Sequence, residues 1–413
     1  MGTEVFKRRK EVEKLISFIG NGKVNVVTGL RRSGKTYLLD TVFKNKLINE
    51  TKLYNESDFG LLYLDGENKN IREETQLDSK LSEFRQSNKK IVIIDEVQLV
   101  NGFASSLKAF VKRNKDISVF VTGSNSDLLS KEIIDKFQGY AESLIVSPLT
   151  YKEILEEMPS YPLNSYLTFG GLPYVTKLAD GEKRSELYRI YTEIYQRDIE
   201  NKLDKELEYL SFDQVEEIIE LIASSSAPFS PSSLAKRFLM GLERTSVDEI
   251  KVAHEIRKVL NVLDKSFLIK SMSVNDYNEI TPLSNIGLNK KYYFSDNGLR
   301  YINCKTDAKT IGLCLENAVF IELNSKGIVP SGKLILAKGN NIDGEIDFNY
   351  RLGDEKYHMQ VTHTINVWDY GREIGNLKKL IQDGRCQVIY IINSLGQEEA
   401  DIEYINAKEF FLS

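Results

Sequence analysis

The sequence predicts an α/β protein of several domains, whose N-terminal part is a parallel sheet sandwiched by helices. Its 413 residues are too many for one hydrophobic core, because a single core stops growing beyond about 250–300 residues. Up to about residue 155, short apolar runs rich in β-branched residues alternate with amphipathic helical runs. This alternation is typical of strand–helix–strand units that build a parallel sheet. A glycine-rich consensus stands between the first such strand and the next helix.

Five buried strands are expected in this first part. They are VNVVTG (24–29), GLLYLD (60–65), KKIVIIDE (89–96), ISVFVTGS (117–124) and SLIVS (143–147). We assign residues 1–158 to this domain and the helical segment 159–210, which contains the turn FGGLPYVT, to a lid or linker.

A different pattern begins near residue 211. Three helical runs, DQVEEIIELIASSSA, SPSSLAKRFL and TSVDEIKVAHEIRKVLNVLDK, precede a strand and a return strand in KKYYFSDNGL. Three helices and a β-hairpin are the pattern of a winged helix, assigned here to residues 211–304. Residues 305–413 are expected to form a small α/β domain. Its elements are helix LENAVFIELNSKG, strands LILAKG, EIDFNY and YHMQVTHT, helix REIGNLKKLIQ and strand CQVIYII. We expect Trp368 to anchor the second of these helices.

Composition and charge narrow the possible partners. The formal net charge is -5, so any contact with nucleic acid is expected to be local rather than spread over the surface. No apolar run has the length of a membrane span, and no apolar segment follows the basic N-terminus as in a signal peptide. Three cysteines without metal or redox spacing indicate reduced thiols. These features together predict a cytoplasmic protein that does not contact a membrane.

Residues 29–36, GLRRSGKT, fit the phosphate-loop spacing G-x-x-x-x-G-K-[ST]. Two glycines let such a loop wrap a phosphate with its backbone N–H groups, and the following helix presents its positive end to the same anion. Lys35 is expected to reach the β- and γ-phosphates, and the Thr36 hydroxyl to join the shell of Mg²⁺. The residues assigned to nucleotide binding are Gly29, Arg32, Ser33, Gly34, Lys35, Thr36 and Tyr37. A P-loop NTPase domain is therefore expected, with ATP and Mg²⁺ as cofactors.

The run IVIIDEVQ supplies the acids that hydrolysis needs. Asp95 and Glu96 follow four apolar residues, at the carboxyl edge of a strand where such sheets bind ligands. Asp95 is expected to hold the magnesium through water, and Glu96 to polarise the attacking water. A third strand ends in Ser124 and Asn125. Ser124, with Asn125 as the second choice, is expected to contact the γ-phosphate or orient the water.

With these residues placed, the chain resembles a family of prokaryotic AAA-type (AAA+ or STAND-like) P-loop ATPases that carry a C-terminal domain of uncharacterised function. The resemblance covers nearly the whole length. It depends on TGLRRSGKT, IDEVQ, TGSNSDLLS, SPLTYKEIL, FGGLPYV, IYQRDI, YYFSDNGLR, LENAVFIEL and GEIDF…QV…REIGNL. It implies an ATP hydrolase with Lys35, Thr36, Asp95 and Glu96 in the roles given above. It also implies that the tail belongs to the PD-(D/E)XK nuclease-like superfamily.

Two departures from the family pattern matter. Relatives often carry Gly-Arg where this chain has Gly139 followed by Tyr140. An arginine finger contributes about 10³–10⁵ in rate where it operates, so slow basal hydrolysis is expected unless another arginine serves. Arg197 is one candidate, although an arginine on a helix surface more often makes only a structural pair.

The second departure concerns the tail. Nucleases of this type need carboxylates that hold a metal and a lysine that stabilises charge on the phosphate. Glu316, Asp347 and Gln360 could fill the first three positions, but Thr362 stands at the position of the lysine. Nuclease activity is therefore not expected, and a degenerate fold used for contacts is favoured.

The third helix of the winged-helix pattern offers a local basic surface. Lys251, His254, Arg257 and Lys258 fall at helical spacings that could share one face, and Lys251, Arg257 and Lys258 are the candidates for contact with DNA phosphates. Acidic residues in the same helix favour instead a structural lid or a protein interface.

The sequence thus favours an ATP-hydrolysing switch whose nucleotide state controls contacts of the C-terminal modules with a partner, which could be DNA, another protein or a second copy of the chain. The alternatives are a DNA-binding, ATP-dependent remodelling factor or nuclease, and a nucleotide-binding scaffold that does not hydrolyse ATP.

Overall fold

The computed structural model divides the chain into two compact units, which we describe separately. The first comprises residues 1–148 with the short segment 265–267, and the second comprises residues 149–264 and 268–413. The structure describes residues 6–64, 71–124, 135–240, 246–276, 290–304, 310–336, 342–368, 370–396 and 398–413.

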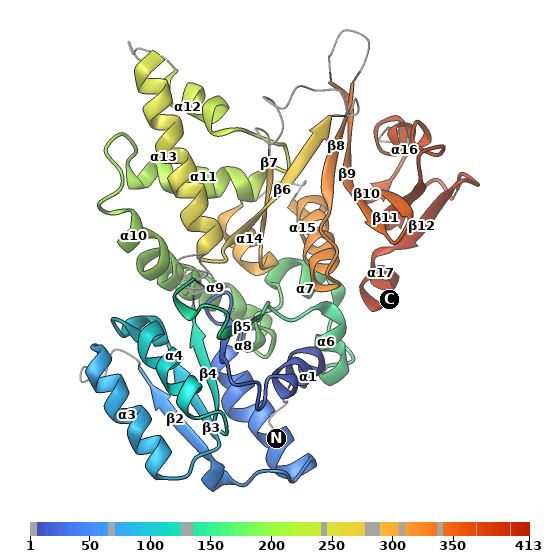
Figure 1. Cartoon of the computed structure of the whole chain (residues 1–413). Coiled ribbons are helices and arrows are strands. Elements are labelled where there is room, and N and C mark those ends of the chain that lie inside the picture. Colours follow the sequence, from blue (N-terminus) through green and yellow to red (C-terminus); the bar gives the residue numbers. More distant parts are fainter. Residues whose placement is uncertain are drawn as a thin grey trace. The chain divides into compact units, whose positions relative to one another are not determined.

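The first unit is built around a parallel sheet of five strands in the order β2-β3-β4-β1-β5 (Figure 1). The strands are β1 (Val24–Thr28), β2 (Phe59–Tyr63), β3 (Ile91–Asp95), β4 (Ser118–Gly123) and β5 (Ala141–Ile145). The helical elements are α1 (Arg9–Ser17), α2 (Lys35–Tyr37), η1 (Leu38–Phe43), η2 (Lys46–Glu50), η3 (Glu56–Asp58), α3 (Glu74–Gln86), η4 (Val97–Leu99) and α4 (Phe103–Arg113). The five predicted strands and the parallel sheet flanked by helices are confirmed.

Both faces of this sheet are covered, because successive side chains of a strand point to opposite faces. On one face, Val26 of β1, Leu77 of α3 and Leu107 of α4 belong to one hydrophobic core. On the other face, Val27 packs with Leu15 of α1 and with the residues of η1. The near-continuous apolar strands in the sequence follow from this burial on both sides.

The second unit begins with helices and continues into a mixed sheet. Its helices are α6 (Tyr151–Glu157), α7 (Leu163–Phe169), α8 (Pro173–Thr176), α9 (Asp180–Ile194), η6 (Tyr195–Glu200), α10 (Asn201–Leu203), α11 (Phe212–Ser224), α12 (Pro231–Leu239), α13 (Ser246–Lys265), α14 (Asn297–Asn303), α15 (Thr310–Ser325), α16 (Tyr370–Lys378) and α17 (Ala407–Leu412). Its strands are β6 (Ile269–Asp276), β7 (Lys290–Phe294), β8 (Ser331–Leu336), β9 (Ile342–Leu352), β10 (Glu355–Ile365), β11 (Arg385–Asn393) and β12 (Ile402–Asn406). The three helices α11, α12 and α13 and the antiparallel pair of β6 and β7 lie where the sequence predicts them.

The hairpin of β6 and β7 does not stand alone, which the sequence did not indicate. The strands of the second unit form one seven-stranded sheet in the order β12-β11-β10-β9-β8-β6-β7, in which β6 pairs in parallel with β8 (Figure 1). The hairpin is therefore the edge of the C-terminal sheet. β12 and α17 were also not predicted, because the sequence after residue 393 shows no strong period.

One sequence-based expectation is wrong in this unit. Trp368 does not anchor α16, because 93% of its surface is exposed. The apolar face of α16 is instead anchored by Ile374 and Leu377, which pack on Ile346 and Val388 of the sheet.

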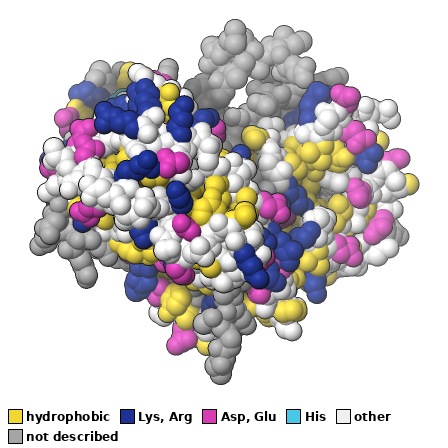
Figure 2. Space-filling model, turned by 60° about the horizontal axis from the view of Figure 1, so that its bottom comes forward, with side chains coloured by type: hydrophobic (Ala, Val, Ile, Leu, Met, Phe, Trp, Pro, Cys, Tyr) yellow, Lys and Arg dark blue, Asp and Glu magenta, His cyan; other side chains and the backbone are white. Residues whose placement is uncertain are grey.

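Within the described part of the chain, no helix combines the length and the apolar character that crossing a bilayer requires. The three cysteines, all described, are free thiols. On the face that Figure 2 presents, basic and acidic side chains are interspersed among hydrophobic ones.

Candidate functional site

The phosphate loop connects β1 to α2, and its two consensus glycines adopt backbone conformations that suit glycine. Gly29 has φ of +143°, and a Cβ atom placed on it would lie 2.2 Å from the carbonyl oxygen of Val146. Gly34, directly before α2, has φ of +94°. Since L-residues rarely adopt such angles, these positions explain why the loop can close tightly against the end of β5.

The consensus lysine and threonine lie at the start of α2. Lys35 is buried, and its Nζ donates to the carbonyl oxygens of Gly29 and Leu30, each at 3.0 Å. The Thr36 hydroxyl donates to Oδ1 of Asp95 at 2.9 Å. The loop after β1 and the acid at the end of β3 are thus in direct contact.

Thr122, at the end of β4, contacts both the acid that ends β3 and the acid that follows it, and the sequence did not single it out. Its hydroxyl donates to Asp95 and accepts the backbone N–H of Glu96 at 3.0 Å. Glu96 has φ of +53°, in the left-handed region, and Gln98 donates to its carboxylate. Thr122 is fully buried, and its hydrogen bond with the N–H of Glu96 holds the left-handed turn at this acid.

Ser124 lies one residue beyond β4 and is buried. Its Oγ accepts a hydrogen bond from a guanidinium nitrogen of Arg31 at 3.1 Å. The phosphate loop therefore places an arginine beside the residue expected to contact the γ-phosphate. Asn125, the second choice at this position, lies outside the described residues.

The remaining residues assigned to the nucleotide differ in exposure. Ser33 is fully buried, whereas Arg32 is exposed with φ of +68°, and Tyr37 is 43% exposed.

Tyr63 donates to Asp40 of η1 at 2.8 Å. Burial, and then the Asp40 carboxylate, raise the pKa of Tyr63 to about 12.

Tyr140 stands where relatives often carry the finger arginine, and Arg197 is one candidate for that role. Tyr140 packs against the core that contains Val26 and Leu107, with the Lys112 ammonium 4.8 Å from its ring centroid. Arg197 is exposed on η6 of the second unit. Its role as a finger stays a prediction.

The donors of this site suit a magnesium nucleotide. Lys35 offers an ammonium inside the loop, Thr36 a hydroxyl beside Asp95, and both glycines allow close approach of a phosphate to the backbone. Lys35 would bind phosphate oxygens, and Thr36 with Asp95 would hold the metal shell. Hydroxyl and carboxylate oxygens are the ligands that a hard cation such as Mg²⁺ prefers.

A second polar cluster lies in the second unit and includes two of the residues considered for a nuclease. Glu316 of α15 and Asp347 of β9 lie 3.2 and 3.6 Å from Nζ of Lys291, which is 1% exposed. Gln360 and Thr362 are buried two residues apart on β10. No sequence signal pointed to Lys291, because it precedes the nuclease-like segment and stands in an ordinary strand.

The basic residues of α13 lie on the surface. Lys251, His254 and Arg257 are exposed, and Lys258 is half-buried. Two of them have neighbours already: Lys251 donates to the Tyr209 hydroxyl at 2.8 Å, and Lys258 lies 2.9 Å from a carboxylate oxygen of Glu206.

The fold and the first site define a class of protein. A five-stranded parallel sheet in this order, a phosphate loop after β1 and an acid pair after β3 are the arrangement of a P-loop nucleotide-binding domain.

Comparisons with known proteins support and narrow this class. Residues 21–155 match the model of a family described as an AAA domain, which supports an AAA-type P-loop ATPase. Residues 161–309 match a domain of unknown function.

Two curated relatives are similar over most of their length. An uncharacterized protein of Methanocaldococcus jannaschii is 27% identical over 409 residues, which cover 92% of this chain and 84% of the relative. An uncharacterized protein of Haemophilus influenzae is 27% identical over 428 residues, covering 96% and 100%. Among solved structures, a Walker-type ATPase of Pyrococcus abyssi is 14% identical with a TM-score of 0.48, over 72% of this chain and 96% of that one. The ADP form of the Aeropyrum pernix ORC2 protein is 16% identical with a TM-score of 0.33, over 73% and 93%.

Proposed function

We propose that the chain is an AAA-type ATP hydrolase that acts as a switch, in which the bound nucleotide controls how the C-terminal modules contact a partner. The observation that carries the hydrolase assignment is the contact of Thr36 with Asp95 at 2.9 Å, next to Lys35 and Glu96. A metal shell, a phosphate ligand and a water-polarising acid are then together at one edge of the sheet.

Each residue of the site has a separate role in ATP binding or hydrolysis. Lys35 exchanges its two carbonyl partners in the loop for oxygens of the β- and γ-phosphates when ATP enters. Bound Mg²⁺ supplies charge neutralisation on the phosphates. Asp95 and Thr36 would orient the metal shell, and Glu96 would polarise the attacking water. Ser124 is expected to hydrogen-bond the γ-phosphate or that water.

Arg31 supplies, within the same chain, the positive charge that an arginine finger would bring to the γ-phosphate. Its guanidinium lies 3.1 Å from Ser124, so a γ-phosphate that reaches Ser124 also comes close to a positive charge. A planar guanidinium suits phosphate oxygens because it offers paired donors. Arg197 of η6 remains the other candidate.

A contact at the end of the first unit supports the coupling that a switch needs. The buried guanidinium of Arg8 donates to the carbonyl oxygen of Ser33 in the phosphate loop at 2.9 Å and to that of Ser147 at 2.7 Å. Ser147 is the residue before Pro148, at which this part of the first unit ends. Movement of the loop on nucleotide binding is thereby linked to the chain that leaves the ATPase domain.

The experiment measures phosphate release from MgATP and hydrogen–deuterium exchange of the full chain. Glu96→Gln should abolish turnover and retain ATP, and its exchange in the second unit should differ from that of Lys35→Ala, which should not bind ATP. Turnover that survives Glu96→Gln would refute the assigned base. Identical exchange in the ATP-bound and ATP-free states would refute the switch.

The alternative is a DNA-dependent ATPase, which the exposed basic face of α13 supports. The carboxylate of Glu206 beside Lys258 weighs against it. Duplex DNA should then stimulate phosphate release at physiological salt, and replacing Lys251 and Arg257 with Ala should remove that stimulation. Hydrolysis that is indifferent to DNA would leave a protein partner or a second copy of the chain as the target.

A further inference from the structure

The ammonium of Lys291 is surrounded by three carboxylates in the second unit. Its Nζ lies 2.7 Å from Glu345, 3.2 Å from Glu316 and 3.6 Å from Asp347. Only 1% of the lysine is exposed, and Glu316 and Asp347 are also buried. Buried carboxylates are stable only where a counter-charge and hydrogen bonds replace water, and here the counter-charge is this ammonium.

The carboxylates are held in place by further contacts. Oε1 of Glu316 accepts the Tyr293 hydroxyl at 2.8 Å, and Oδ2 of Asp347 accepts the backbone N–H of Val361 at 2.9 Å. The cluster therefore draws on β7, α15, β9 and β10, and is not a chance meeting of long side chains.

An irregularity in β9 helps to direct two adjacent side chains to the same side of the sheet. Ser331 pairs with Asn349 and Lys333 with Ile346, so β9 has one residue more than β8 between these pairs. Such a bulge leaves two neighbouring side chains on one side. Accordingly Asp347 contacts Lys291, and the Phe348 ring lies 5.7 Å from that of Tyr293.

The arrangement does not fit a divalent metal while Lys291 is present. A nuclease metal would need oxygens of Glu316 and Asp347, but the ammonium already contacts both and Glu345 as well. With the ammonium in place, no three His, Cys, Asp or Glu side chains among the described residues are arranged to hold a metal ion. The three acids, all within 3.6 Å of Nζ, supply the counter-charge that this buried ammonium needs.

We propose that Lys291 is a tethered cation that fills the carboxylate cluster in place of a divalent metal, and that the same carboxylates form a latent divalent-cation site which opens when the ammonium is removed. The cluster then joins the hairpin of β6 and β7 to the C-terminal sheet instead of activating water. Three carboxylates against one ammonium leave an excess of negative charge, which is why removal of the lysine should create affinity for a divalent cation. This inference is independent of ATP hydrolysis.

The test measures Mn²⁺ binding to the full chain without nucleotide. Calorimetry and the Mn²⁺ electron paramagnetic resonance signal are the two readouts. Wild type should show no saturable site in this cluster. Lys291→Met, which keeps most of the aliphatic stem, and Lys291→Gln should each gain one Mn²⁺ per chain, and Mn²⁺ should raise their melting temperatures. Adding Asp347→Asn to either variant should remove the gained site.

Two outcomes would overturn the proposal. One is Mn²⁺ binding to wild type that disappears in Asp347→Asn, since the cluster would then accept metal beside the lysine. The other is a folded Lys291→Met or Lys291→Gln protein that binds no Mn²⁺. The wild-type comparison decides whether the cluster excludes metal beside the lysine, and using both Lys291→Met and Lys291→Gln gives two chances of a folded variant that tests the latent site.

Discussion

Replacing Thr122 with Val tests whether the end of β4 positions the two acids of β3. The substitution is nearly isosteric and leaves no large cavity at this fully buried position. It removes the hydroxyl that accepts the Glu96 N–H at 3.0 Å and donates to Asp95. A buried donor left without a partner costs about 1–3 kcal/mol, so the free energy of unfolding should fall by an amount in that range.

The effect on turnover should exceed the effect on binding. Without the hydroxyl, the left-handed turn at Glu96 loses the contact that holds it, and the carboxylate no longer points steadily at the attacking water. We expect kcat to fall about tenfold to a hundredfold, where each factor of ten corresponds to about 1.4 kcal/mol. KM for ATP should change little, because Lys35 and the loop remain intact.

The assay is phosphate release over a range of MgATP concentrations, combined with urea unfolding. Thr122→Ser keeps the hydroxyl and should retain most of the wild-type kcat, so it serves as the matched control. The reasoning is refuted if Thr122→Val turns over ATP at the wild-type rate, or if Thr122→Ser is as slow as Thr122→Val.

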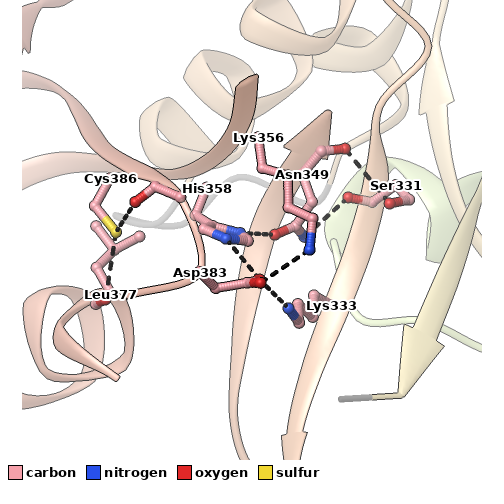
Figure 3. Close-up of polar contacts among 9 residues, drawn as sticks. Ser331, Lys333, Asn349, Lys356, His358, Leu377, Asp383 and Cys386 are labelled. Carbon is pink, nitrogen blue, oxygen red and sulfur yellow. Dashed lines mark hydrogen bonds and ion pairs between the residues drawn. The ribbon is translucent and has the colours of Figure 1, made fainter. Parts of the chain in front are cut away.

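Three further predictions concern the phosphate loop and the C-terminal sheet. Arg31→Ala should lower kcat by at least about tenfold while ATP still binds, because charge near the γ-phosphate is lost, and Arg31→Lys should recover part of it; equal rates in all three proteins would contradict the proposed role. Gly29→Ala should abolish binding of a fluorescent ATP analogue, since its Cβ would meet the Val146 carbonyl at 2.2 Å; wild-type affinity would show that the loop adjusts freely. The ring nitrogens of His358 lie 2.5 Å from Asn349 and 3.1 Å from Asp383 (Figure 3), and burial, followed by the Lys333 charge, lowers the His358 pKa. The unfolded chain therefore takes up this proton first, so the free energy of unfolding should decline as the pH falls below about 6.5. His358→Gln should make the free energy of unfolding, measured with urea at several pH values, depend less on pH in that window. An unchanged pH dependence would refute the assignment.

Asp383 should act in a separate, more acidic window. Hydrogen bonding to Lys356, with further help from Lys333, lowers its pKa to about 2. The stability from this carboxylate is present above its unfolded pKa of about 3.9 and is lost as the pH falls from there toward 2. The two windows therefore separate the histidine from the aspartate in one pH series.

The sequence by itself determined the features that depend on local pattern. The phosphate loop, the acid pair after an apolar strand and the five strands of the first sheet all follow from spacing and from runs of buried residues. These signals are local because a glycine-rich turn and a helix N-terminus bind phosphate through their own backbone. The order of motifs also led to Glu316 and Asp347, which the structure brings to one ammonium.

Only the tertiary structure decided which side chains from different strands meet. Thr122 matters because β4 pairs with β3, and Arg31 matters because β4 also pairs with β1; no local period encodes these pairings. Lys291 reaches its carboxylates because β6 joins β8 and because β9 carries an extra residue. Trp368 is exposed although the sequence predicted that it anchors the helix that follows. Contacts between distant segments depend on strand order and register, and these are set by the packing of the whole unit.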